Sequence, residues 1–240
     1  MSVTINMKDN VAQLQRTPLY GLLYNWYAIA DARGVAPTGW HVATMANWNS
    51  LQLEYDSGAT NYNSATAGGP VKETGTTHWD SPNTGATNIS GFTALPAGER
   101  IFFPDYLGGP TCDYKHKRAV FLCSDERSSI YANSFVLYND SAYFGWNDQN
   151  RSKGSVAMSV RLIRDTIIGW NEGDTITDYD GNIYHTVRIG MKIWAVENLA
   201  TTHYNNGDPI SEVTSNLDWL SLTTGALCAY NNDWSDVFKS

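Results

Sequence analysis

The residues best able to do chemistry in this chain of 240 residues are its cysteines, and their spacing matches no reactive motif. Cys112, Cys123 and Cys228 form no CxxC pair and no Cys/His pattern of the kind that binds zinc. An odd number leaves at least one thiol unpaired. We expect all three to be small core residues, and Cys112 with Cys123 is the local pair to check for a disulfide.

The acids and histidines also lack a catalytic arrangement. Asp125 and Glu126 are adjacent, and neighbours in a strand point to opposite faces, so they cannot flank one bond as a catalytic pair. No HExxH or similar ligand spacing occurs among the five histidines, His41, His78, His116, His185 and His203. The sequence therefore predicts no catalytic residues and a protein that is not an enzyme.

One acidic cluster imitates a calcium loop. Asp178, Asp180 and Asn182 match its start, but the twelfth position, which should be acidic, is Ile189. A hairpin turn at Asp180-Gly181 explains the cluster better. We predict no metal site and no cofactor. Calcium among loop carboxylates and amides stays an alternative that no ligand spacing supports.

The segment 131–153, YANSFVLYNDSAYFGWNDQNRSK, is the best candidate for ligand binding. Tyr and Trp supply rigid amphipathic surface, and Asn, Ser and Asp supply adaptable hydrogen bonds, as in a paratope. The alternative is that its aromatic residues pack the sheet while its polar residues make turns. Where the polar density is highest we predict ligand contacts from Tyr143, Trp146, Asn147, Asp148, Asn150 and Arg151.

The elements that must position these residues divide into helices first and strands later. Apolar residues at helical spacing predict a helix over 19–30, and Thr44 caps a second helix that turns Met45, Trp48 and Leu51 inward. Between them the sequence predicts a turn at 37–39 and a strand at 40–42. A long polar loop follows at 56–91, which we expect to be functional or well pinned.

From residue 92 onward the chain is strand-like. Aromatic and β-branched residues alternate with polar ones in GFTALPAGER, RAVFLCS, SFVLYND, AYFGWND and SVRLIRD. A Gly-rich joint follows, then a hairpin-like stretch from 178 to 199 and a loop-rich tail with Trp219, Leu222 and Tyr230 as anchors. The pattern predicts an α+β protein with an antiparallel sheet.

Several blocks carry a family resemblance. YGLLYNWYAIAD, PTGWHVATMANWNSL, VKETGTTHWDSPNTGATNISGFTALPAGER and SVRLIRD resemble successive motifs of the Fibrobacter succinogenes major paralogous domain family. DYDGNIYHTVRIGMKIWAVENLATTHYNNGDPI, continued by LDWLSLTTGALCAYNND, resembles that family's opening motif, which normally comes first. The resemblance implies a bacterial surface module with no assigned catalytic activity.

GWHVATMANWNSL and SVRLIRD are also similar to the paired motifs of the C-type-lectin-like group, which includes formylglycine-generating enzymes and phage receptor-binding proteins. That similarity implies two helices flanking a twisted antiparallel sheet, with long loops forming the binding face. The enzymes of the group need cysteines near the end of this core. Because residues 125–165 contain none, thiol-dependent oxidation is not expected.

The reversed order implies four parts: an N-terminal arm at 1–17, a C-type-lectin-like body at 18–166, a joint at 167–174 and the family's opening segment at 175–240. That last segment would complete the core of the same chain, as in a circular permutation, or of a neighbouring subunit, as in a segment swap. Either way, the chain near Asp233 should lie beside residues 18–20, and Trp194 should be buried.

Charge and composition limit the partners. A net charge of −8 disfavours nucleic acid, and no stretch approaches the length that crosses a bilayer. With no secretion signal at the start, we expect a bacteriophage virion protein, made in the host cytoplasm and displayed as capsid decoration, fibre or tail. It would bind a host-surface glycan or protein, form a homo-oligomer such as a trimer, and attach to other virion proteins through the arm. The alternative is a bacterial extracellular carbohydrate-binding or adhesion module.

Overall fold

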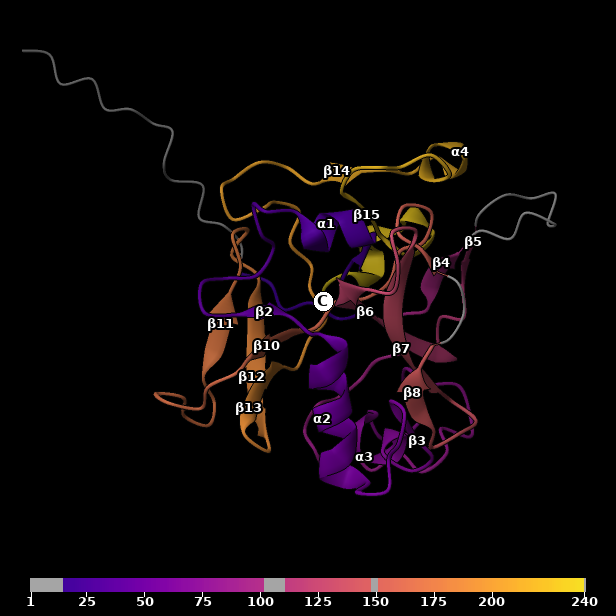
Figure 1. Cartoon of the computed structure of the whole chain (residues 1–240), viewed down its shortest axis with the longest axis vertical. Coiled ribbons are helices and arrows are strands. Elements are labelled where there is room, and N and C mark those ends of the chain that lie inside the picture. The colour runs from indigo at the N-terminus through magenta and orange to yellow at the C-terminus, as the bar shows by residue number, and fades with distance from the viewer. Residues whose placement is uncertain (1–14, 102–110, 148–150, 240) are drawn as a thin grey trace, which may run out of the picture.

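The computed structural model describes residues 15–101, 111–147 and 151–239 (Figure 1). Strands outnumber the few short helices, and two larger sheets lie on either side of the view. The expected α+β class is therefore confirmed. In the described part of the chain no helix is both long and apolar enough to cross a membrane.

The first large sheet joins the two halves of the chain. Its order is β11-β12-β13-β10-β2, with every neighbouring pair antiparallel. Strand β10 lies between β2 and β13, and Ile163 is paired with Trp194. The C-terminal segment therefore extends the sheet of its own chain. The strands are β2 (His41–Val42), β10 (Leu162–Arg164), β11 (Thr175–Thr177), β12 (Ile183–Ile189) and β13 (Lys192–Ala195).

The second large sheet is antiparallel and comes mostly from the middle of the chain. Its order is β3-β8-β7-β6, with β9 also paired to β7. The strands expected around 118–124, 134–140 and 142–148 are confirmed here. They are β3 (Asn63–Ser64), β6 (Arg118–Glu126), β7 (Tyr131–Tyr138), β8 (Phe144–Trp146) and β9 (Arg151–Ser152). A separate pair joins β4 (Glu99–Ile101) to β5 (Thr111–Asp113).

A third, small sheet corrects the first predicted helix. Strand β1 (Leu23–Tyr24) pairs with β15 (Ala226–Cys228), which is parallel to β14 (Ser211–Glu212). Helix α1 is only Trp26–Ala30, because Asn25 is extended and its side chain caps the helix. Of the expected 19–30 helix, only residues 26–30 are helical. Leu23 and Tyr24 are instead buried in β1, because Cys228 and Leu227, far along the chain, are their strand partners.

The second predicted helix is confirmed as α2 (Met45–Tyr55). Thr44 accepts a hydrogen bond from Asn47 N, and the Asn47 side chain accepts one from Thr44 N, which makes a reciprocal N-terminal cap. The predicted inward residues Trp48 and Leu51 are buried. The remaining helical pieces are short: α3 (Gly68–Val71), α4 (Asn216–Trp219), η1 (Tyr230–Asn232) and η2 (Trp234–Asp236).

Aromatic side chains from both halves of the chain fill one part of the core. The Trp48 ring lies 4.9 Å from the ring of Phe121 and 4.9 Å from that of Trp194, centroid to centroid. Trp194 is 1% exposed, so its expected burial is confirmed. Arg161, also buried, crosses between the halves: its guanidinium donates to Asn198 Oδ1 at 2.6 Å and to the carbonyl oxygens of Phe92 and Ala195 at 3.0 and 2.9 Å.

The long 56–91 loop is held by a buried cation. Lys72 Nζ donates to the carbonyl oxygens of Thr84, Tyr138 and Ser141, each at 2.9 Å. These three bonds fix the loop against strand β7 and the turn that follows it. The expectation that the loop is well pinned is confirmed.

The two ends of the described chain lie together. Leu19 N donates to Val237 O at 2.8 Å, and Pro18 forms an isolated bridge with Phe238. The expected closeness of the Asp233 region to residues 18–20 is confirmed by the bond from Tyr20 N to Asp236 O at 3.2 Å. The joint itself folds into turns, with Trp170 N bonded to Ile167 O at 3.1 Å.

Candidate functional site

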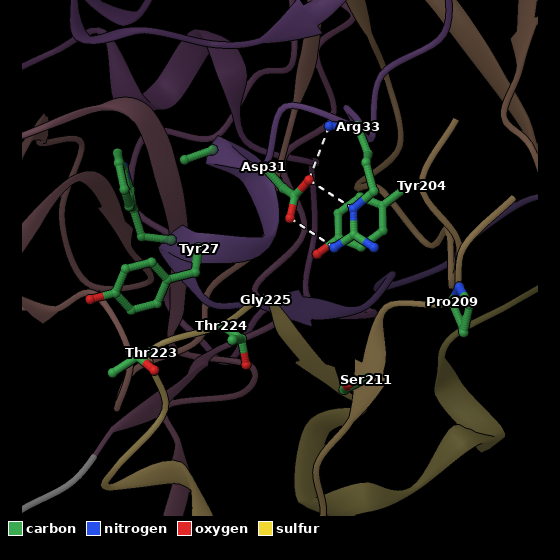
Figure 2. A pocket seen from close by; sticks show the side chains of 11 residues that line it. Tyr27, Asp31, Arg33, Tyr204, Pro209, Ser211, Thr223, Thr224 and Gly225 are labelled. Carbon is green, nitrogen blue, oxygen red and sulfur yellow. Dashed lines mark hydrogen bonds and ion pairs between the residues drawn. The ribbon is translucent and has the colours of Figure 1, made fainter. Parts of the chain in front are cut away.

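A pocket of about 560 Å³ opens at the seam between the first and last parts of the chain (Figure 2). One wall is α1 with the turn that follows it, and the other walls come from the C-terminal segment. In Figure 1 the two parts lie next to each other beside β15. The lining residues are Trp26, Tyr27, Ala30, Asp31, Arg33, Tyr204, Pro209, Ser211, Thr223, Thr224 and Gly225.

Asn25 holds the walls together. It is fully buried, and its amide nitrogen donates to Thr224 O at 2.9 Å. Its side-chain oxygen accepts from Ala28 N and from Ala226 N, each at 3.0 Å. The same side chain therefore caps α1 and fixes the 224–226 stretch across the pocket.

Two glycines allow the walls to approach so closely. A Cβ at Gly225 would lie 2.1 Å from Tyr204 Oη and 2.9 Å from Ala28 Cα. A Cβ at Gly154 would lie 2.0 Å from Leu222 O. Real Cβ atoms do not sit at such distances, so larger residues at these positions would push the wall carrying Thr223 and Thr224 outward.

The polar rim is organised around one arginine. Arg33 Nη2 contacts Asp31 Oδ2 at 2.8 Å, Arg33 Nε donates to Asp31 Oδ1 at 2.9 Å, and Arg33 Nη1 contacts Asp208 Oδ2 at 3.0 Å. The guanidinium carbon lies 3.9 Å from the centroid of the Tyr204 ring, and in Figure 2 the Arg33 guanidinium overlaps that ring. Tyr204 is buried, so Arg33 is stacked on a rigid base.

These contacts keep both rim carboxyl groups ionised. Hydrogen bonds from Arg33 lower the pKa of Asp31 to about 2. Hydrogen bonds from Asn206 and then from Arg33 lower the pKa of Asp208 below its usual range. A glycoside hydrolase needs one carboxylic acid that stays protonated near neutral pH, and neither rim carboxyl meets that requirement.

The remaining lining is suited to a neutral, hydroxyl-rich ligand. Tyr27 is half-buried and presents an aromatic ring, while Ser211, Thr223 and Thr224 present exposed hydroxyl groups. Because Arg33 is already paired with two carboxylates, the rim carries a net negative charge and has no spare cation for an anionic group.

The predicted ligand contacts that the structure describes lie outside this pocket, beside and within β8 and in β9. Tyr143 is half-buried and its hydroxyl donates to Asn63 Oδ1. Trp146 is half-buried, its indole nitrogen donates to Asn133 Oδ1 at 3.1 Å, and Arg127 lies 4.8 Å from its ring. Both rings pack against core residues, as the alternative interpretation of the segment expected.

Two of the other predicted contacts are buried. Asn147 is 7% exposed and its N–H donates to Ser134 O at 2.8 Å. Arg151 is 8% exposed and its guanidinium contacts Glu99 Oε1 at 2.9 Å. Glu99 is fully buried, so this arginine neutralises a core carboxylate. Asp148 and Asn150 lie outside the described residues.

The remaining acid and histidine predictions concern structure. Asp178 Oδ1 accepts from the backbone N–H groups of Asp180 and Asn182, each at 3.0 Å, which is the predicted hairpin turn. His78 Nδ1 is 2.8 Å from Glu73 Oε1, so this histidine makes a hydrogen bond within the 56–91 loop. Among the described residues, no three His, Cys, Asp or Glu side chains are grouped as metal ligands.

The comparison with protein families identifies most of the chain. The sequence profile described as the Fibrobacter succinogenes major domain matches residues 4–164. The chain belongs to this family. Neither the curated proteins nor the solved structures gave a match.

The seam pocket has one wall inside the matched Fibrobacter succinogenes major domain and one beyond it. Residues 26–33 lie within the match, whereas Tyr204 and residues 223–225 follow it. Sequence reasoning missed this site because its residues meet only in the folded chain. Two motifs in the sequence could have indicated the site. They are NWYAIADAR and SLTTGAL, and together they supply most of the lining residues.

Proposed function

We propose that the protein is a non-catalytic recognition module that binds a neutral, hydroxyl-rich ligand, a surface glycan, in the seam pocket. The observation that supports this most strongly is the lining itself: the aromatic residues Trp26 and Tyr27 line the cavity together with three hydroxyl-bearing residues and a charge-paired rim. Sugars are bound by such combinations, because an aromatic face covers their C–H groups while polar side chains bind their hydroxyls.

A binding role agrees better with this site than a catalytic one. The two carboxylates share one arginine and have lowered pKa values, so they stabilise the rim and do not provide an acid and a base. The lining offers no histidine or cysteine as a nucleophile or base. What the pocket does offer is shape and hydrogen bonding, which are requirements of recognition.

We also propose a C-type-lectin-like fold with the family's two segments in reversed order. Three features support this: α2 between the two large sheets, the pairing of β2 with β10, and the insertion of 175–240 into the body's own sheet. The contact between residues 18–20 and 236–238 agrees with a permutation, because the junction of the usual order would lie there.

The proposed setting is the outer surface of a bacteriophage particle, as a homo-oligomer that binds its host, with a bacterial extracellular adhesion module as the alternative. The net charge of −8 supports a ligand other than nucleic acid in both settings. Mass spectrometry of purified particles from a producing culture tests the choice. Peptides of this chain in the particles support display, and their presence only in the cell-surface fraction favours the alternative.

A printed array of neutral and acidic oligosaccharides tests the function. We expect the chain to bind neutral members, and the affinity for the best of them to fall by about 5- to 150-fold in Tyr27→Ala, which corresponds to roughly 1 to 3 kcal/mol for a central aromatic contact. Titration calorimetry with that oligosaccharide measures the change. Circular dichroism shows whether the variant stays folded.

Two further variants separate the pocket from other faces. Tyr62→Ala removes a partly exposed aromatic ring outside the pocket and should leave binding unchanged. Trp146→Ala tests the segment first predicted from sequence. If Trp146→Ala abolishes binding while Tyr27→Ala does not, the site is on β8 and the seam pocket is not the binding site. Binding only to acidic oligosaccharides would contradict the neutral ligand.

A further inference from the structure

Two cysteines that are far apart in the sequence lie against each other. Cys112 is in β5 and Cys228 is in β15, and both belong to one apolar cluster with Leu23 and Ala157. The strand pairings explain how they meet: Cys112 is paired with Arg100, Arg100 bridges to Ala157, and Cys228 is paired with Leu23. Cys112 packs against the apolar cluster that contains the buried Cys228, and each thiol shifts the pKa of the other.

The local pair to check for a disulfide, Cys112 with Cys123, is not the pair that lies together. Cys123 is fully buried in the other core cluster, around Trp48 and Phe121. All three cysteines are free. Sequence distance favoured Cys112 with Cys123, whereas the fold brings Cys112 to Cys228 and leaves Cys123 among aromatic rings.

The surroundings of the two sulfurs differ in a way that assigns separate roles. Cys112 is partly exposed, and Cys228 is fully buried. The hydrogen bond from Cys228, then the Asn231 N–H and the positive charge of Arg100, lower the pKa of Cys112 to about 7. The hydrogen bond to Cys112 and burial raise the pKa of Cys228. Arg100 is itself buried at 2% exposure, and Tyr230 packs beside the pair.

We propose that Cys112 and Cys228 are a redox site, in which Cys112 reacts with small-molecule disulfides and Cys228 then closes an internal disulfide. This modification would link β5 to β15, and β15 directly follows the pocket residues Thr223 to Gly225. The bond would therefore tie one pocket wall to the body. The inference does not depend on what the pocket binds.

The reaction balances as two thiol–disulfide exchanges. The Cys112 thiolate attacks one sulfur of a small disulfide such as oxidised glutathione, whose second half leaves as a thiolate, and a mixed disulfide forms on Cys112. Cys228 then loses its proton and attacks the Cys112 sulfur, which releases the other half as a thiolate. The two protein thiols are oxidised, and one small disulfide is reduced to two thiols.

Incubation of the full chain with oxidised glutathione, followed by acid quenching, alkylation and trypsin digestion, tests the site. The three cysteines fall in separate tryptic peptides, 101–115, 119–127 and 193–239. We expect a disulfide between peptides 101–115 and 193–239, with Cys123 free. Alkylation of Cys112 by iodoacetamide before oxidation should have a pH midpoint near 7, well below that of an ordinary thiol.

Variants make the outcome decisive. Cys123→Ala should form the same bond, Cys112→Ser should form none, and Cys228→Ala should stop at a stable glutathione adduct on Cys112. If Cys228→Ala fails to fold, the peptide map of Cys123→Ala still shows whether Cys112 and Cys228 form a disulfide. A bond that contains Cys123, a bond only between two chains, or three free thiols after oxidation would each overturn the proposal.

Discussion

The indole rings of Trp48 and Trp194 lie 4.9 Å apart in the centre of the core, although one is in helix α2 and the other in strand β13. Both side chains are buried, at 0% and 1% exposure. Phe92 and Phe121 contact the pair, so the aromatic cluster takes residues from the beginning, middle and end of the chain. This contact makes the C-terminal segment part of the main core.

Trp194→Ala should therefore destabilise the whole protein. Loss of a buried aromatic side chain costs about 3–5 kcal/mol, because the transfer free energy is lost and a cavity remains. Urea denaturation followed by circular dichroism measures the change. Trp234 is 37% exposed, and Trp234→Ala should change the free energy of unfolding by less than about 1 kcal/mol. Equal losses in the two variants would show that Trp194 is not a core residue.

Much of the body could be predicted from local patterns. The cap at Thr44 and the alternation of apolar and polar residues in β6 and β7 each involve only a few neighbouring residues. These elements can therefore be predicted from the sequence alone. The first part of the helix expected at 19–30 was wrong for the opposite reason. Leu23 pairs with Cys228 across nearly the whole chain, and no local pattern reports that partner.

The functional residues were harder to predict. Arg151 stands in a polar stretch of the kind that loops display, yet it is buried because Glu99 needs a cation in the core. Arg33 stands in an ordinary-looking turn, and its importance depends on Asp208 and Tyr204, which are far along the sequence. Such pairings come from tertiary structure, and composition around a single residue does not reveal them.

Gly225→Ala should disturb the seam pocket. The new methyl group would approach Ala28 Cα at 2.9 Å, and the backbone there cannot move freely because Asn25 holds it. Overpacking of this kind costs about 1–3 kcal/mol. Urea denaturation measures the loss, and binding of the array-selected oligosaccharide should weaken with it. Gly58→Ala is the matched control, because its nearest neighbour is an exposed side-chain oxygen at 3.3 Å. If Gly225→Ala leaves the free energy of unfolding unchanged, the pocket wall is free to move.

The titration of Asp31 should report the organisation of the rim. Its pKa of about 2 in the folded chain is below the ordinary 3.8, so the folded state prefers the ionised form. The stabilising contribution is therefore fully present above about pH 4 and is lost as the pH falls through 2. Carboxyl-detected NMR on labelled aspartate measures the midpoint. In Arg33→Gln the midpoint should return towards 3.8, and an unchanged midpoint would assign the shift to another group.

The joint offers a test of how the two segments are held together. Gly169 and Gly173 adopt left-handed backbone conformations, and Ile168 in the same joint is 80% exposed, which makes this stretch suitable for an inserted protease site. After cleavage, the fragment containing residues 175–240 should stay bound, because β13 remains paired with β10, β15 with β1, and Trp194 stays in the core. Size-exclusion chromatography should show both fragments in one peak in native buffer and two peaks in urea.

The Trp194→Ala version of the same cleaved chain should release its C-terminal fragment at a lower urea concentration. Separation of the wild-type fragments in native buffer would mean that residues 175–240 are an independent unit, and that result would contradict the reversed-order proposal.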